Sequence, residues 1–164
     1  MKGVHPLVAM ALVTVISVVA ISLVFQMGNP AVERTKEIAL LQEGKSNLIE
    51  IRNYIDNVAW EGEGSTRSLP LSISGGSYSI DTQNDMILFS MDTSAQIIGV
   101  GVSKNEDDIE IKGYLNRIYL NLSFTNFDIT GGGEFGKGSH TIVIKNNGFN
   151  STNQKQIINL MSVR

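Results

Sequence analysis

An uninterrupted apolar segment near the N-terminus constrains this chain more than any other feature of its sequence. From Val4 to Phe25 the only acidic or basic residue is His5. The stretch Leu7–Phe25 is nineteen residues long. At about 1.5 Å of rise per helical residue it spans about 28 Å, close to the hydrocarbon thickness of a bilayer. The segment is therefore long enough and apolar enough to cross a membrane as one helix.

The residues around this segment do not form an ordinary secretory signal. Such a signal has a basic start, an apolar core of roughly 7–15 residues and a cleavage site of small residues after the core. No such site follows Phe25, whereas Gly3 lies directly after Lys2 and before the apolar segment. Cleavage after Gly3 would remove three residues and leave the apolar helix on the mature protein.

The order of Lys2, Gly3, Val4 and Pro6 resembles the leader of archaeal type IV pilin-like proteins, the class III or prepilin-type signal peptide. The resemblance implies that a prepilin peptidase cuts after Gly3 and that Val4 becomes the first mature residue. It also implies that Pro6 opens the pilin helix, where its missing N–H costs nothing and its fixed φ is already helical. Bacterial pilins carry a glutamate at the fifth mature position; here that position is Val8, which fits the archaeal proteins.

The resemblance implies an extracellular filament as the functional form. Residues 1–3 would be the leader, and residues 4–27 a helix that spans the membrane in the precursor and forms the filament core afterwards. The implied partners are further copies of the chain, the prepilin peptidase, an assembly ATPase with its membrane platform, and membrane lipid before assembly. Lys2 is the sole charge before the span, which favours a cytoplasmic N-terminus. The rest of the chain is then expected outside the cell.

Composition limits the other partners and the chemistry. The net charge is −3 and no basic patch is present for nucleic-acid phosphates, so nucleic acid is not expected as a partner. The chain has no cysteine. An extracellular fold must then be held by packing alone, without disulfides.

A second helical pattern follows the apolar segment. Gly28 and Pro30 interrupt the apolar run, and they predict a kink or a short melted stretch between two helical halves. Residues 31–60 are charged and amphipathic. Their apolar seam repeats every seven residues at Leu41, Leu48 and Ile55, which predicts a helix packed on the chain's own sheet, with a solvated coiled coil as the less favoured use.

The helix is expected to end near Trp60, because Gly62 and Gly64 supply a helix stop. The stretch from Trp60 to Leu69 also resembles the junction between helix and sheet in archaeal proteins with the same leader. Gly44 interrupts the apolar seam at a cost of about 1 kcal/mol relative to alanine. It is expected either to let another backbone approach or to soften the helix.

Residues 65–164 change to a period of two and predict an antiparallel β domain. Gly75-Gly76 predicts a hairpin turn between two short strands. Pro70 is expected at a sheet edge or bulge. The fold class is thus α+β: a long N-terminal helix followed by an antiparallel sandwich or curled sheet of six or seven strands. The further predicted strands are Met86–Met91, Ala95–Val102, Ile109–Phe124, His140–Lys145 and Ile157–Val163.

Catalytic and metal-binding patterns are weak throughout the sequence. The two histidines, His5 and His140, have no metal-ligand spacing, and His140 is interpreted as a strand-edge residue. Asn105–Asp108 is interpreted as a solvated turn rather than a calcium loop, because it lacks alternating oxygen ligands and a distal glutamate. The glycines between 131 and 138 predict a flexible loop rather than a phosphate cradle. We expect no enzyme activity and no cofactor.

Two N-glycosylation sequons occur, at Asn121 and at Asn150. Asn121 is expected to point away from the core, because Leu120 and Leu122 share the opposite face of a strand. Asn150 lies in a loop rich in Asn and Gly. Glycans at both positions would coat the exposed face of the β domain.

Three functional hypotheses of different classes remain open from the sequence. The first is a structural subunit of an archaeal type IV pilus-like filament that serves adhesion, with an archaellum subunit as its nearest neighbour. The second is a membrane-tethered extracellular binding domain or a minor pilin, which forms no homopolymer. The third is a surface-tethered hydrolase, for which the sequence offers no site.

Overall fold

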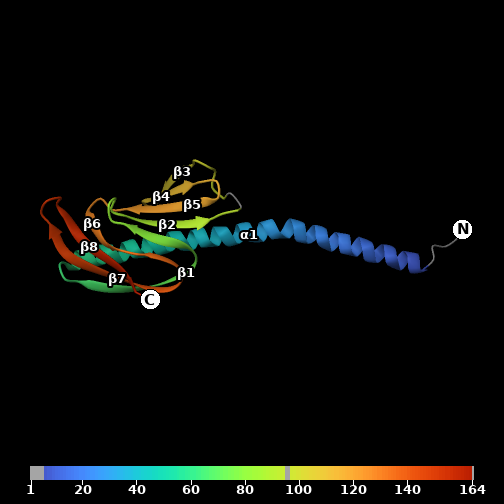
Figure 1. Cartoon of the computed structure of the whole chain (residues 1–164), viewed down its shortest axis with the longest axis horizontal. Coiled ribbons are helices and arrows are strands. Elements are labelled where there is room, and N and C mark those ends of the chain that lie inside the picture. Colours follow the sequence, from blue (N-terminus) through green and yellow to red (C-terminus); the bar gives the residue numbers. More distant parts are fainter. Residues whose placement is uncertain (1–5, 95–96, 164) are drawn as a thin grey trace.

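A computed structural model describes residues 6–94 and 97–163 of the chain. The fold is α+β, with one long helix, α1 (Pro6–Glu61), followed by a single eight-stranded sheet (Figure 1). The strands are β1 (Thr66–Asp81), β2 (Met86–Asp92), β3 (Ser103–Glu106), β4 (Ile109–Gly113), β5 (Arg117–Ser123), β6 (Phe127–Gly132), β7 (Glu134–Asn150) and β8 (Lys155–Val163).

The sheet is open and mostly antiparallel, in the order β3-β4-β5-β2-β1-β7-β8-β6. Only the pair of β6 and β8 is parallel, with Ile129 opposite Ile158. In Figure 1 the sheet curls around the second half of α1. The predicted sandwich is therefore wrong and the curled sheet is correct. The physical reason is that α1 covers the inner face of the sheet, so a second sheet is not needed to bury it.

The core lies between the second half of α1 and the inner face of the sheet. Leu48, Ile51, Ile55 and Val58 are at most 1% exposed, which confirms that the apolar seam of the helix packs on the chain's own sheet. The sheet contributes alternate residues of its strands, as its period of two predicts. These include Leu69, Leu71, Ile73, Ile87, Phe89, Met91, Ile118, Leu120, Leu122, Ile142, Ile144, Ile158 and Leu160.

Two hydrogen bonds of the Tyr78 side chain on β1 fix the position of α1 along the sheet. The hydroxyl of Tyr78 accepts a hydrogen bond from Nδ2 of Asn47 at 3.1 Å and donates to the carbonyl of Gly44 at 3.4 Å. The ring of Tyr78 packs on Phe89 and Phe135, with centroids 4.7 and 5.3 Å away. Burial raises the pKa of Tyr78 well above its usual value, so the hydroxyl keeps its proton.

The predicted hairpin at Gly75-Gly76 is wrong. β1 runs straight through both glycines, and its partner on both sides of them is β7: Ile73 pairs with Gly138, and Ser77 with Gly136. The irregularity between these pairs is a bulge. Gly76 has φ +79°, and a β-carbon there would lie 2.6 Å from Cε2 of Phe89. The glycine is required by the close approach of a core ring and not by a chain reversal.

Two further segments differ from the sequence prediction. Of the predicted strand Ala95–Val102, residues 95–96 lie outside the described residues, and residues 97–102 form a turn in which Val102 donates to the carbonyl of Gly99 at 3.1 Å. The glycines of 131–138, predicted as a flexible loop, end β6 and begin β7 instead. Gly131 lies against the backbone of Leu160 with no room for a β-carbon, so this glycine permits close packing of β6 on β8.

Pro70 lies on a locally free edge, as predicted. Of the residues of β1, only 77–81 pair with β2. Among the described residues, Pro70 therefore has β7 alone as a strand neighbour, opposite Thr141. Because Pro has no N–H to donate, it fits the side of β1 that carries no ladder.

The long helix is continuous across the predicted interruption. Gly28, Asn29 and Pro30 all lie within α1, so no melted stretch separates the apolar half from the packed half. Figure 1 shows α1 gently bent along its length, with its N-terminal half extending well beyond the sheet. A kink caused by Gly28 and Pro30 stays a prediction.

Candidate functional site: the exposed half of the long helix

The N-terminal half of α1 is apolar on every side and contacts no other part of the described chain. Its large side chains from Val8 to Phe25 are between 53% and 73% exposed. Soluble monomers rarely expose contiguous apolar patches of more than a few hundred Å². These side chains are Val8, Met10, Leu12, Val13, Val15, Ile16, Val18, Val19, Ile21, Leu23, Val24 and Phe25. The segment therefore needs a covering of lipid or of other protein.

The few polar side chains of this segment are satisfied within the helix. Thr14, Ser17 and Ser22 each donate a hydrogen bond to the carbonyl four residues earlier, at 2.9, 2.8 and 2.9 Å. In a medium without water, a hydroxyl with no partner would be costly. Because each hydroxyl bonds to its own helix, the outer surface of the segment presents no unmet hydrogen-bonding side chain to lipid.

Charge marks the end of the apolar segment. The first charged residue after Pro6 is Glu33, followed by Arg34 and Lys36. Within the described residues, α1 is a helix long and apolar enough to cross a membrane by length and composition, and none of its apolar window is buried in the fold. A long apolar helix near the N-terminus, which could anchor the chain in a membrane, is therefore a property of the structure.

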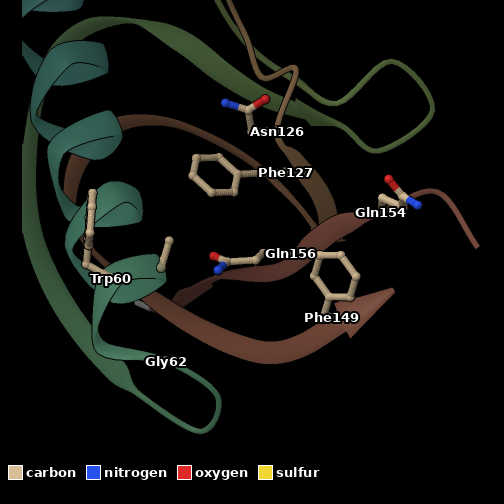
Figure 2. A pocket seen from close by; sticks show the side chains of 8 residues that line it. Trp60, Gly62, Asn126, Phe127, Phe149, Gln154 and Gln156 are labelled. Atoms are coloured by element: carbon tan, nitrogen blue, oxygen red, sulfur yellow. The ribbon is translucent and has the colours of Figure 1, made fainter. Parts of the chain in front are cut away.

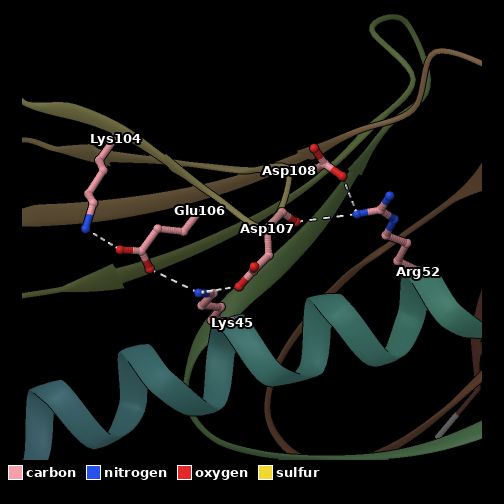
Figure 3. A network of polar contacts seen from close by, with 6 residues as sticks. All are labelled: Lys45, Arg52, Lys104, Glu106, Asp107 and Asp108. Atoms are coloured by element: carbon pink, nitrogen blue, oxygen red, sulfur yellow. Dashed lines mark hydrogen bonds and ion pairs between the residues drawn. The ribbon is translucent and has the colours of Figure 1, made fainter.

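The packed half of α1 is tied to the sheet by ion pairs as well as by apolar contacts (Figure 3). Nζ of Lys45 lies 3.0 Å from Oε2 of Glu106 and 2.8 Å from Oδ2 of Asp107. About two turns further along the helix, Nη1 of Arg52 lies 2.7 Å from Oδ2 of Asp108. We call these five residues the helix latch, since they join α1 to the turn between β3 and β4.

The ion pairs of the helix latch shift the pKa values of Glu106 and Lys45. Lys104, which pairs with Glu106 from within β3, and then Lys45 lower the pKa of Glu106 to about 2. The carboxylates of Asp107 and Glu106 raise the pKa of Lys45. Glu106 and Lys45 therefore both carry their charges at neutral pH, and this ion pair helps to hold β3 against the helix.

The acidic stretch Asn105–Asp108 is a turn only in its second half, because Asn105 and Glu106 end β3 and Asp107 and Asp108 make the turn to β4. Asp107 and Asp108 have φ values of 52° and 64°, the left-handed conformation that two-residue hairpin turns use. Across the described ranges 6–94 and 97–163, no group of three or more His, Cys, Asp or Glu side chains could hold a metal ion. The carboxylates face cationic side chains of α1 instead.

A second polar contact ties α1 to the end of β2. Oε2 of Glu37 accepts a hydrogen bond from the hydroxyl of Thr93 at 2.6 Å. Oε1 of the same carboxylate accepts the backbone N–H of Ser94 at 2.9 Å and its hydroxyl at 2.8 Å. The rigid attachment of the helix therefore begins near Glu37, and the apolar half projects from that point.

The processing residues Lys2, Gly3 and Val4 lie outside the described residues, as does His5. Pro6 is the first described residue of α1, and its expected role in opening the helix stays a prediction, because the preceding residues lie outside the described ones. His140 is not an edge residue: it lies within β7, is 6% exposed, and its Nε2 is 2.8 Å from the carbonyl oxygen of Gly136.

The two sequons occupy different environments, although each amide donates to a carboxylate. Asn121 points away from the core, as predicted, but it is half-buried on β5 and its Nδ2 donates to Glu110 at 3.3 Å. Asn150 is the last residue of β7, next to an exposed turn at residues 151–154, and its Nδ2 donates to Asp128 at 3.2 Å.

Comparison of the chain with protein-family models, with curated proteins and with solved structures finds no match.

Proposed function

We propose that this chain is a structural subunit of an archaeal type IV pilus-like filament, with adhesion or surface attachment as its use. The observation that carries the proposal is the division of one continuous helix into a packed half and a bare apolar half. The folded β domain is complete without the bare half. A second role is therefore required for that half, and polymerisation through the helix supplies one.

The free energy of the bare half of α1 is lower when lipid or protein surrounds it than when water does. Burial of one Val, Leu, Ile or Phe side chain contributes about 1.5–3 kcal/mol, so the twelve side chains from Val8 to Phe25 together represent on the order of tens of kcal/mol. Lipid tails are as apolar as leucine, so transfer from bilayer to filament gains little from hydrophobicity. Packing between helices must drive that step.

The continuity of α1 supports this role mechanically. The same helix carries the bare half and the apolar seam around Leu48 and Ile55. A load applied to the β domain would pass through the helix latch and the core into the filament axis without crossing a loop. The β domain would then form the outer surface, with Asn150 as a candidate site for a glycan.

The precursor would be held in the membrane by its apolar helix, with the N-terminus in the cytoplasm. A prepilin peptidase would cut between Gly3 and Val4. An assembly ATPase and its membrane platform would then move the subunit from bilayer to filament, which would leave the β domain outside the cell. Heterologous contacts that do not close into a ring propagate as a helical fibre.

Expression of the full chain in an archaeal host with a prepilin peptidase tests the proposal. Surface structures are sheared from the cells, and the N-terminus and morphology of the released protein are determined. Filaments whose subunits begin at Val4 support the proposal. Protein that stays in the membrane and begins at Met1 contradicts it and favours a membrane-tethered binding domain.

The same experiment separates the related alternatives. Cleaved subunits without a homopolymer indicate a minor pilin. Filaments that rotate and propel the cell indicate an archaellum subunit, whereas filaments required only for attachment indicate a pilus.

A further inference from the structure

An aromatic groove lies at the end of the sheet that α1 does not cover. The helix ends at Glu61, but β6, β7 and β8 continue past it. On the side of these strands that faces the helix, Phe149, Gln156 and Phe127 are paired in one row across the three strands. Together with Trp60 they border a groove of about 560 Å³ (Figure 2).

The aromatic rings in this groove are unusually exposed. Trp60 is 90% exposed and Phe149 is 61% exposed. Figure 2 shows Trp60 on the helix side, Phe149 on the strand side and Phe127 beside them, with Gln156 between the rings. Aromatic side chains normally bury 150–250 Å² each and dominate interfaces, so a ring left bare beside a groove indicates a ligand surface.

The polar side chains of the groove are all amides. Asn126, Gln154 and Gln156 lie in its lining, and no charged side chain does. Oε1 of Gln156 is buried and has no hydrogen-bond partner among the described residues. A buried carbonyl without a donor is rare in folded proteins. A hydroxyl of a bound ligand would supply the missing donor.

We propose that this groove binds a neutral carbohydrate chain. The C–H groups on one face of a sugar ring are slightly positive and pack on the negative face of an aromatic ring. Sugar hydroxyls both donate and accept, which matches amide groups that present a carbonyl and an NH₂. The row of Phe149, Gln156 and Phe127 alternates the two kinds of contact.

The composition of the groove disfavours the other occupants. A phosphate, sulfate or acidic sugar would need a cation, and the described lining has none. A second copy of the chain is the rival occupant, and it is separated by the dilution experiment below. The proposal is independent of polymerisation, because the groove lies in the folded domain and not on the apolar half of α1.

Trp60 makes the proposal directly measurable, because it is the only tryptophan in the chain. We would purify the full chain in a polyoxyethylene ether detergent, because maltoside detergents carry a sugar headgroup and phosphocholine detergents carry a quaternary ammonium that packs on aromatic rings. Maltohexaose, cellohexaose, mannohexaose and chitohexaose would each be titrated to millimolar concentration while tryptophan emission is recorded. The proposal predicts a saturable change in emission with at least one of the four. No change with any of them would overturn it.

Variants then test whether the groove is responsible. Phe149→Ala and Gln156→Leu leave the reporter in place, and each is expected to weaken binding of the active oligosaccharide about tenfold or more. Tyr114→Ala is the matched control, because Tyr114 is 54% exposed and lies after β4, away from the groove. Circular dichroism establishes that each variant is folded. Equal affinity in the wild type and both groove variants, or equal loss with Tyr114→Ala, would refute the groove as the binding site.

A dependence on protein concentration separates the rival occupant. If emission changes on dilution in the absence of sugar, and sedimentation shows dimers to dissociate over the same range, a second copy covers Trp60 and the carbohydrate proposal fails. Emission that is constant on dilution and responds to sugar supports it.

Discussion

Gly44 of α1 lies so close to the ring of Phe89 on β2 that a β-carbon at position 44 would be 2.5 Å from Cε1 of that ring. The contact explains why the apolar seam of the helix contains a residue with poor helix propensity. Of the two roles expected for this glycine, close approach is the one the structure supports, although the partner is a side chain and not a backbone. The same ring also excludes a β-carbon at Gly76, so Phe89 fills a space bounded by two glycines.

We predict that Gly44→Ala destabilises the β domain. Alanine gains about 1 kcal/mol in helix propensity, but a forced shift of Phe89 costs about 1–3 kcal/mol, so the net loss is expected to be about 0–2 kcal/mol. Gly28→Ala is the matched control in the same helix, because no described atom lies within 4 Å of a β-carbon there. Thermal unfolding of the full chain in detergent measures both. A higher midpoint for Gly44→Ala than for the wild type would contradict the close contact with Phe89.

A charge in the middle of the bare half should abolish its function. Val18 is 58% exposed, and the exposed side chains three residues before and after it, Val15 and Ile21, are apolar. A lysine at a bilayer centre costs about 2.5–3.5 kcal/mol, so Val18→Lys is expected to block membrane insertion or filament assembly. Gln42→Lys, also on an exposed position of α1, serves as the control and should assemble. Normal yields of sheared filaments from Val18→Lys would rule out a helix core.

The helix latch should weaken in acid. Lys104 and Lys45 lower the pKa of Glu106 from its usual 4.5 to about 2. A lowered folded pKa contributes stability that is present above about pH 4.5 and is lost as the pH falls toward 2. The melting temperature of the wild type should therefore fall more steeply across this window than that of Glu106→Gln. The comparison is needed because Glu61, Asp81 and Glu110 also have lowered pKa values. Parallel curves for the two proteins would exclude a stabilising role for Glu106.

The two sequons are predicted to be modified unequally. Asn121 is half-buried in β5 between two strands, whereas Asn150, which is also half-buried, ends β7 next to an exposed turn. A transferase reaches the amide of Asn150 more readily, so peptide mass spectrometry of protein from an archaeal host should find a glycan at Asn150 and none at Asn121. Thr152→Ala removes the Asn150 sequon and should remove the glycan. A glycan at Asn121 alone would show that strand burial does not decide the site.

Local patterns predicted the elements whose side chains have one dominant environment. The heptad spacing of Leu41, Leu48 and Ile55 identified the packed half of α1, and alternation at Ile118, Leu120 and Leu122 identified the inner face of β5. The apolar run was equally clear, because no charge interrupts it between Leu7 and Phe25. In each case the period alone determines which face is buried.

The structural role of a glycine was predicted wrongly where that role depends on residues that are distant in the sequence. Gly75 and Gly76 have the composition of a turn, but Gly76 admits the ring of Phe89 and Gly75 lies against Leu40, both of which are more than ten positions away in the sequence. The glycines at 131 and 132 have the composition of a loop, but they end a strand that pairs in parallel with β8. Close approach in three dimensions leaves no periodic signal along the chain.

The ion pairs of the helix latch and the aromatic groove also could not be predicted from local sequence patterns. Lys45 and Arg52 are visible as a cationic face of the helix, and Asp107 and Asp108 as an acidic turn, but their pairing follows from the curl of the sheet. Trp60 marked only the end of α1. Its exposure depends on β6, β7 and β8 continuing past the helix, which requires the topology to be known.

The absence of cysteine makes the central claim, that the bare half of α1 packs against copies of itself, directly testable. Single cysteines are introduced as Val18→Cys and, on the exposed surface of β7, as Lys137→Cys. Lipid-free filaments are then treated with a water-soluble maleimide or with an oxidant. The account predicts that Cys at position 18 is protected from the maleimide and forms crosslinks between subunits, whereas Cys at position 137 reacts freely. Rapid labelling at position 18, with no crosslinks in intact filaments, would contradict it.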